Sequence, residues 1–227
     1  MTDEPDVTRV AAAIGDATRM RMLTLLMDGR ALTAKELAYS AGVEPATATS
    51  HLRRLSDSAL IRATPTGRHK YFRLASPHVA RLLESLFIVA PRPVVTRPPT
   101  SAPDPLRAAR FCYDHLAGRL GTRLTTALVE RGMVRARGRA YVITPSGDAW
   151  FDALGIDVAA ARRSRRKLAY RCLDWSERTD HLAGALGAAL ADRLLALDGI
   201  QRERRSRIVS ITPTGERELR RRLGVVS

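Results

Sequence analysis

The chain has 227 residues, of which 45% are hydrophobic, so it is long enough for one large or two modest domains with buried cores. Its 38 lysine and arginine residues outnumber 23 aspartate and glutamate residues, and the net charge of +15 favours a polyanionic partner, nucleic acid first. Two cysteines exclude a disulfide framework, no apolar run reaches the length of a membrane span, and the acidic N-terminus lacks a signal region, so we expect a cytoplasmic protein without membrane contact.

A proline-rich segment divides the sequence. Residues 90–105 read APRPVVTRPPTSAPDP, and proline lacks the amide donor that helices need. We therefore expect a linker at residues 91–105, between a domain at residues 1–90 and a second domain at residues 106–227.

The first domain opens with helix start and stop signals. Asp16 is a candidate N-cap and Gly29 a candidate stop for one helix. Thr33 and Glu36 have the spacing of a capping box at the start of a second helix, and Gly42 permits the left-handed turn that ends it.

A third helix, from Pro45 to about residue 57, has two different faces. The inward face predicted from helical spacing contains Ala48, His51, Leu52 and Leu55. The opposite face contains small or hydroxyl side chains and one guanidinium group: Ala46, Thr49, Ser50 and Arg53. A helix that enters the major groove of DNA needs such a face, so we expect Thr49, Ser50 and Arg53 to contact base edges. Thr47 and Arg54 flank this face and suit phosphate contacts.

The segment LIRATPTGRHKYFRL predicts a strand, a turn at residues 64–67 and a second strand. Arg68, His69 and Lys70 form a cationic tip, which we expect to border the minor groove. Residues 77–90 predict an amphipathic helix whose apolar stripe has no evident partner in a small domain, which indicates a dimer interface: Val79, Leu82, Leu83, Leu86 and Phe87.

This order of elements resembles the ArsR/SmtB family of winged helix-turn-helix regulators. GDATRMRML is similar to the family's Asp-x-Thr-Arg-x-x-x-Leu entry, and ATATSHLRRL is similar to its recognition helix. The resemblance covers about residues 8–90. It implies a homodimeric repressor that binds a double-stranded DNA operator and is released by a ligand.

The same resemblance leaves the effector open. Some members of the family bind thiophilic metals through cysteines in the first helix of the helix-turn-helix, but TAKELAYSA has no cysteine. Others bind zinc on the last helix, where SPHVARLLESL offers only His78 and Glu84, too few for a tetrahedral site.

The second domain contains an internal duplication. Cys112-Tyr-Asp followed by HLAGRLG is repeated as Cys172-Leu-Asp, a six-residue insert and HLAGALG. Each copy later reaches TP(S/T)G, where Thr144 and Thr212 are expected to cap helices. We therefore predict a mainly α protein with small β wings (α+β), whose second domain is helix-rich with two related helix–strand–helix units for effector sensing or dimerisation.

The repeated cysteines and histidines admit several interpretations. If Cys112 and His115 share one face of a helix, they could join Cys172 and His181 in a Cys₂His₂ set for zinc or another thiophilic metal. The alternatives are ordinary packing, a redox thiol pair or a thiol activated by Arg110 or Arg171, and an apolar ligand pocket lined by Tyr113, Trp150, Phe151 and Trp175.

Two other classes of function compete with the regulator. An enzyme using Cys112 as nucleophile and His115 as base needs an orienting group, and Asp114 is expected on a different helix face, so we predict no enzyme. An architectural DNA-binding protein is the second alternative, and the small polar face of the third helix favours a defined operator instead. The basic stretch ARRSRRKLAYR at residues 161–171 is either a solvated surface or an added DNA-backbone contact.

Overall fold

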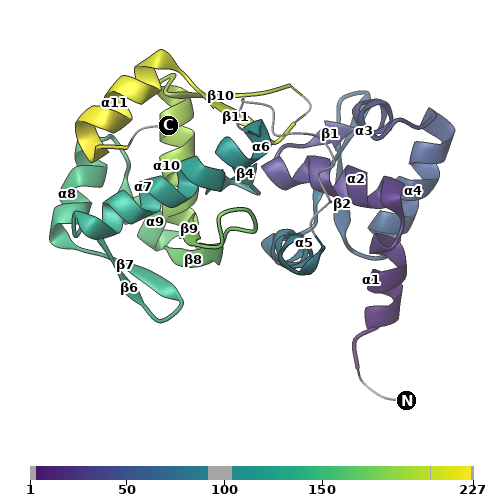
Figure 1. Ribbon diagram of the computed structural model, residues 1–227. Coiled ribbons are helices and arrows are strands. Elements are labelled where there is room, and N and C mark those ends of the chain that lie inside the picture. The colour runs from purple at the N-terminus through teal and green to yellow at the C-terminus, as the bar shows by residue number, and fades with distance from the viewer. Residues whose placement is uncertain (1–3, 92–103, 205, 226–227) are drawn as a thin grey trace. The chain divides into compact units, whose positions relative to one another are not determined.

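The computed structural model describes residues 4–91, 104–204 and 206–225 and divides into two compact units, Met1–Leu83 and Glu84–Ser227 (Figure 1). Most of the expected linker, residues 92–103, lies outside the described residues. Within the described ranges, no helix is both long and apolar enough to cross a membrane.

The N-terminal unit begins with helices whose ends carry the predicted caps. They are α1 (Val7–Ile14), α2 (Ala17–Leu25), a 3-10 turn (Leu26–Asp28), α3 (Ala34–Ala41) and α4 (Pro45–Asp57). Asp16 accepts a hydrogen bond of 2.9 Å from the Arg19 amide, and Thr33 and Glu36 form the capping box. Gly29 and Gly42 end their helices in the left-handed region, so these predictions are confirmed.

A three-stranded antiparallel sheet completes the winged helix-turn-helix. Its order is β1 (Leu32–Thr33), β3 (His69–Leu74), β2 (Ile61–Thr66). The predicted turn at residues 64–67 is wrong by two residues, because Thr64 and Pro65 still pair with Tyr71 and Lys70. Proline is tolerated there since β2 is an edge strand. The turn itself is Gly67-Arg68.

Helix α5 (Pro77–Val89) follows the sheet and spans the boundary between the two units. Within its predicted apolar stripe, Val79 and Leu83 are buried in the single chain, whereas Leu82 remains 36% exposed.

The C-terminal unit consists of two copies of one arrangement: short helix, hairpin, long helix, hairpin, helix. The first copy is α6 (Pro105–Ala108), β4 (Arg110–Cys112), β5 (His115–Ala117), α7 (Gly118–Glu130), β6 (Val134–Arg137), β7 (Ala140–Ile143) and α8 (Pro145–Ala153). The second is α9 (Val158–Arg163), β8 (Tyr170–Leu173), β9 (Asp180–Ala183), α10 (Ala185–Ala196), β10 (Ile200–Arg202), β11 (Val209–Ile211) and α11 (Pro213–Leu223).

The predicted helix–strand–helix units therefore missed both strands of the first hairpin in each copy, where a helix was expected, and one strand of the second hairpin. The missing strands are three or four residues long, and the two-residue connection in Cys112-Tyr113-Asp114-His115 is too short to show a helix or strand period. The caps at Thr144 and Thr212 are confirmed, since each hydroxyl accepts from the amide three residues later.

The two copies interlock through their strands. The second hairpin of the first copy pairs with the first hairpin of the second copy, where Ala140 lies opposite Tyr170. Reciprocally, Arg110 of β4 forms a bridge with Ile208 beside β11, and the Phe111 amide donates to the Arg207 carbonyl at 2.8 Å. Each copy thus completes its sheet with strands of the other.

The long helices interlock in the same way. A Cβ on Gly121 of α7 would lie 2.4 Å from the Leu116 carbonyl and 3.6 Å from the His181 Cβ. A Cβ on Gly187 of α10 would lie 2.4 Å from the Leu182 carbonyl and 3.2 Å from the His115 Cβ. Glycine therefore lets each helix approach its own hairpin and the histidine of the other copy.

Candidate functional site

Helix α4 presents the predicted groove-facing residues to solvent. Ala48, Leu52 and Leu55 are buried, as expected, and the opposite face is exposed: Ala46, Thr47, Thr49, Ser50, Arg53 and Arg54. The Thr49 hydroxyl donates to the Pro45 carbonyl at 2.9 Å, and Arg53 Nε lies 3.9 Å from Asp57 Oδ2 in a highly exposed pair. Such a pair breaks at little cost, so the guanidinium group is available to another acceptor.

The tip of the wing presents three exposed cations. Arg68 occupies the second turn position, and His69 and Lys70 begin β3. His69 lies edge-on to Tyr71 with ring centroids 6.4 Å apart.

The two cysteines and their histidines form one cluster in the C-terminal unit. They do not lie on helices as predicted: Cys112 and His115 face each other across the β4–β5 hairpin, and Cys172 and His181 across β8–β9. The ligand atoms of all four side chains lie within 4.8 Å of one another, and the two sulfur atoms are 4.0 Å apart. The duplication therefore brings together all four predicted residues.

The cluster has the dimensions of a closed tetrahedral metal site. Two thiolates about 2.3 Å from a zinc ion lie about 3.8 Å apart in tetrahedral geometry, close to the spacing of the cysteine sulfurs. All four side chains are buried, and Nε2 of both His115 and His181 has no hydrogen-bond partner among the described residues. Buried nitrogen atoms without a partner are costly unless a ligand satisfies them, so these residues fit a thiophilic cation.

An aspartate carboxylate lies near Nδ1 of each imidazole ring. Asp114 Oδ1 lies 3.1 Å from His115 Nδ1, and Asp174 Oδ2 lies 3.5 Å from His181 Nδ1. The Asp114 contact is a hydrogen bond of the kind that orients a metal-binding histidine and leaves Nε2 for the ion, whereas His181 Nδ1 makes no hydrogen bond among the described residues. The recurrence of an aspartate two residues after each cysteine is the sequence signal for this role.

The pKa shifts of the cluster residues show which protonation states a bound cation would change. The hydrogen bond to Cys172 and burial raise the pKa of the Cys112 thiol, and burial lowers the pKa of His181. Burial also opposes protonation of His115, but Cys112 and Asp114 outweigh it and raise its pKa to about 9. A bound cation would favour the thiolate forms, since metal ligands must be deprotonated.

Asp174 also holds the C-terminal unit together. It is fully buried, accepts hydrogen bonds from Arg110 at 2.9 Å and from the Gly118 amide at 2.7 Å, and bonds the hydroxyl of Ser176. Gly118 starts α7 of the first copy, so an aspartate of the second copy serves both that helix and the His181 ring.

Two other interpretations of the C-terminal unit do not agree with the structure. Thiol activation by arginine fails because Arg110 and Arg171 pair with Asp174 and Asp180, and the Cys112 pKa is raised. The aromatic residues expected to line a ligand pocket serve packing instead: Phe151 is a fully buried core residue, Trp150 packs beside it, and Trp175 lies under Arg110.

The expected separation of Asp114 from the His115 ring is wrong. Asp114 is not on a separate helix face, because the Tyr113-Asp114 turn brings its carboxylate to His115. What argues against a nucleophile is that the Cys112 thiol is only 2% exposed and has a raised pKa, so little thiolate is available to a substrate.

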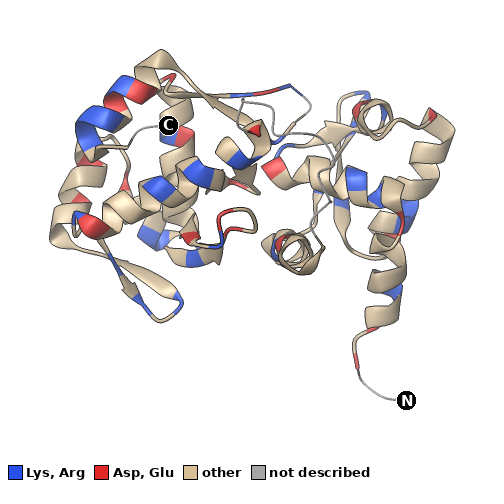
Figure 2. Cartoon of the chain, in the orientation of Figure 1, with Lys and Arg blue, Asp and Glu red and all other residues tan. Residues whose placement is uncertain are grey.

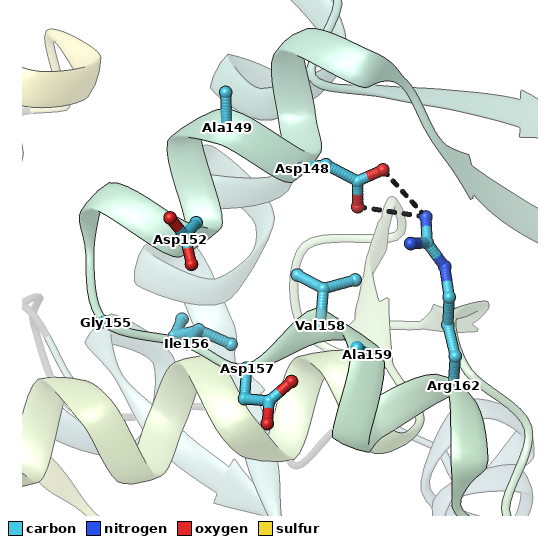
Figure 3. A pocket seen from close by; sticks show the side chains of 9 residues that line it. All are labelled: Asp148, Ala149, Asp152, Gly155, Ile156, Asp157, Val158, Ala159 and Arg162. Atoms are coloured by element: carbon cyan, nitrogen blue, oxygen red, sulfur yellow. Dashed lines mark hydrogen bonds and ion pairs between the residues drawn. The ribbon is translucent and has the colours of Figure 1, made fainter.

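An open pocket of about 750 Å³ lies elsewhere in this unit, between α8 and α9 (Figure 3). Two of its three acidic residues have structural roles: Asp148 pairs with Arg162 at 2.9 Å, and Asp157 caps α9. Helix α3 contains no cysteine, and on α5 His78 contacts Arg81 while Glu84 pairs with Arg207 at 3.0 Å. The Cys/His cluster is thus the best candidate for metal chemistry in the described residues.

Comparison with known proteins identifies the family. Residues 14–63 match a helix-turn-helix domain model. Over 222 residues the chain is 39% identical to YdfF of Bacillus subtilis, an HTH-type transcriptional regulator, with 97% of this chain and 98% of the relative covered. The chain belongs to the ArsR family of HTH-type transcriptional regulators. It is a DNA-binding transcription regulator, and the C-terminal unit is shared with YdfF.

Other relatives of this ArsR-family chain match a smaller share of it. CmtR of Mycobacterium tuberculosis is 35% identical over 83 residues, which cover 37% of this chain and 70% of CmtR. A solved structure titled as the homodimeric winged helix-turn-helix DNA-binding domain of Mb0332 from Mycobacterium bovis is 28% identical, covers 39% of this chain and 89% of its own, and has a TM-score of 0.35.

Proposed function

We propose that the protein is a homodimeric repressor that binds a double-stranded operator through α4 and the wing, and that a ligand of the C-terminal unit releases it. Residues 1–90 would then serve DNA binding and dimerisation, and residues 106–227 sensing. The observation that carries this proposal is the outward face of α4, where Thr49, Ser50 and Arg53 are exposed opposite a buried apolar face.

The roles of individual residues follow from their chemistry. Thr49, Ser50 and Arg53 contact base edges, and Thr47 and Arg54 contact phosphates. Arg68, His69 and Lys70 of the wing border the minor groove. A two-fold dimer repeats these contacts one helical turn away, and the exposed Leu82 of α5 is available to such an interface. Binding to an operator in chromosomal DNA agrees with the expected cytoplasmic location of the protein.

The effector is a thiophilic metal ion, zinc first, held by Cys112, His115, Cys172 and His181. Two thiolates and two imidazoles suit zinc, and the four ligand atoms within 4.8 Å of one another support a single ion per chain. Asp114 and Asp174 would orient the imidazoles, and the ion would neutralise the buried thiolates.

Selection of bound duplexes from a random DNA pool, followed by affinity measurements at about 0.15 M salt, tests operator binding. A repressor of this kind enriches a palindromic sequence and binds it about a thousandfold or more tighter than random DNA. Equal affinity for all duplexes would favour an architectural protein instead.

The same operator then tests the effector. Zinc-loaded protein and protein stripped by a chelator are compared for metal content and operator affinity. We expect one zinc ion per chain and weaker operator binding by the zinc-loaded form, and tighter binding by that form would overturn release by the metal. Stoichiometric zinc without any change in affinity would make the ion structural, and no zinc would leave the cluster as packing.

A further inference from the structure

The β6–β7 hairpin of the C-terminal unit is strongly cationic. Arg135 and Arg137 lie on β6, Arg139 lies in the turn, and all three are exposed. The hairpin sequence VRARGRAYVI contains no acidic residue. Figure 2 shows the basic positions at the end of this hairpin, which extends away from the helices of its unit.

These three arginines differ from several others in the same unit, because their side chains have no partner among the described residues. Arg162, Arg166 and Arg171 each form an ion pair with an aspartate at 2.5–2.9 Å. Within the described part of the chain, neither an ion pair nor a hydrogen bond involves the side chains of Arg135, Arg137 or Arg139. Three like charges within five residues repel one another, and a polyanion relieves this repulsion.

The hairpin has the same turn as the wing of the N-terminal unit. Gly67-Arg68 in the wing and Gly138-Arg139 here are two-residue connections between antiparallel strands, with glycine φ angles of 59° and 57°. Thr66 and His69 flank the first turn as a strand pair, and Arg137 and Ala140 flank the second. Both turns therefore present an arginine at the equivalent position.

The hairpin is also held by the rest of its unit. It forms half of the sheet β6-β7-β8-β9, and the Arg171 amide donates to the Arg139 carbonyl at 3.0 Å. Arg171 precedes Cys172 of the Cys/His cluster, so the strand that carries one cluster cysteine holds the turn end of the hairpin. A fixed cationic hairpin loses less side-chain and backbone entropy on binding than a mobile arginine-rich tail.

We propose that this hairpin is a second DNA-contacting wing, in which Arg135, Arg137 and Arg139 bind the phosphate backbone of duplex DNA. It goes beyond operator recognition by α4, because phosphate contacts are independent of sequence. The guanidinium group is suited to this role, since it binds phosphate through two parallel hydrogen bonds.

The test measures the affinity of the full-length protein for a mixed-sequence duplex of about 40 base pairs, by fluorescence anisotropy between about 50 and 200 mM salt. Three variants are compared with the parent chain: R135A/R137A/R139A, the charge-retaining R135K/R137K/R139K, and the control R217A/R220A/R221A. The control removes the same charge from exposed positions of α11.

We expect the hairpin alanine variant to reduce the salt slope, log Kd against log salt, by about 2.7, which corresponds to three phosphate contacts at about 0.9 each. The lysine variant should keep the slope, and the control should change it far less. A slope unchanged in the hairpin alanine variant, or reduced equally in the control, would overturn the proposal.

Failure of this proposal is separate from failure of operator recognition. Binding to mixed-sequence DNA does not depend on base contacts from α4, whereas selection of a specific duplex does. Far-ultraviolet circular dichroism of each variant shows whether the sheet is intact. If the triple alanine variant unfolds, the single variants R135A, R137A and R139A decide the question, since each should reduce the slope by about 0.9 and an unchanged slope in all three would overturn the proposal.

Discussion

The sulfur atoms of Cys112 and Cys172 lie 4.0 Å apart, although 60 residues of chain separate the two cysteines. Each sulfur atom belongs to a hairpin of a different copy, and each hairpin also supplies one histidine. An ion at this position would therefore join the two copies, and neither copy alone offers more than two ligands.

Replacement of Cys112 or Cys172 by serine should abolish stoichiometric metal binding. A hydroxyl is a poor ligand for a thiophilic ion, and three remaining ligands do not close the site. Native mass spectrometry under reducing conditions measures the expected change from one ion per chain to none. Retention of the ion in both serine variants would place the metal elsewhere.

Asp114→Asn should weaken metal binding about 10- to 100-fold while leaving the four ligands in place, because an amide holds the imidazole less well than a carboxylate. Competition with a chromophoric chelator measures this affinity. Asp180→Asn is the matched control, since Asp180 lies on the other hairpin of the site but pairs with Arg171. Equal effects of both changes would contradict an orienting role for Asp114.

Gly121→Ala should destabilise the C-terminal unit by about 2 kcal/mol or more, despite the better helix propensity of alanine. The new Cβ would lie 2.4 Å from the backbone carbonyl of Leu116, which cannot move without shifting β5. Both tryptophans, Trp150 and Trp175, belong to this unit, so urea unfolding followed by tryptophan fluorescence reports on it alone. Gly15→Ala, in the other unit, should leave that transition unchanged.

Stability of the C-terminal unit should decrease as the pH falls below about 4. Burial alone would raise the pKa of Asp174, but the Arg110 guanidinium and hydrogen bonds from Ser176 and the Gly118 amide outweigh it and lower that pKa below the unfolded value of about 3.9. The carboxylate therefore stabilises the fold above that value, and protonation at lower pH removes the contribution.

Asp174→Asn tests the same interaction at neutral pH. It leaves the buried Arg110 charge without a counter-ion and should cost about 3–5 kcal/mol. Urea unfolding of the variant should also depend less on pH between about 5 and 3 than unfolding of the parent chain. Asp148→Asn removes an exposed pair with Arg162 and provides the comparison. If the variant loses as much stability at low pH as the parent chain, the loss is due to other carboxylates.

Arg53→Ala and Arg54→Ala should weaken operator binding in different ways. Loss of a base contact at Arg53 should cost about 1–3 kcal/mol and relax the preference at one base pair, whereas loss of a phosphate contact at Arg54 should weaken all duplexes alike. Binding to a panel of single-base operator variants separates the two outcomes. A uniform loss for both changes would make Arg53 a phosphate contact.

Local signals predicted the N-terminal unit because they specify its elements one at a time. The caps at Asp16 and Thr33, the left-handed Gly42 and the two faces of α4 are all properties of a few neighbouring residues. The wing turn was misplaced because Pro65 reads as a turn residue, and only its position on an edge strand makes it compatible with pairing.

The C-terminal unit was harder to predict because its short strands are stabilised by partners far away in the sequence. β4 and β5 have three residues each, too few to show a period of two, and β4 is completed by residues near Ile208. The four cluster residues could be named from the repeat itself. Their meeting could not, because it depends on the exchange of strands between the copies.

The exchange of strands between the two copies has a consequence for folding during synthesis. All four cluster residues precede β10 and β11 in the chain, so they emerge from the ribosome before those strands do. Until those strands arrive, β4 has an open edge that could pair with another nascent chain. An ion bound during translation would join the β4–β5 and β8–β9 hairpins before β10 and β11 emerge. The edge of β4 would then be held in position to pair with its own chain.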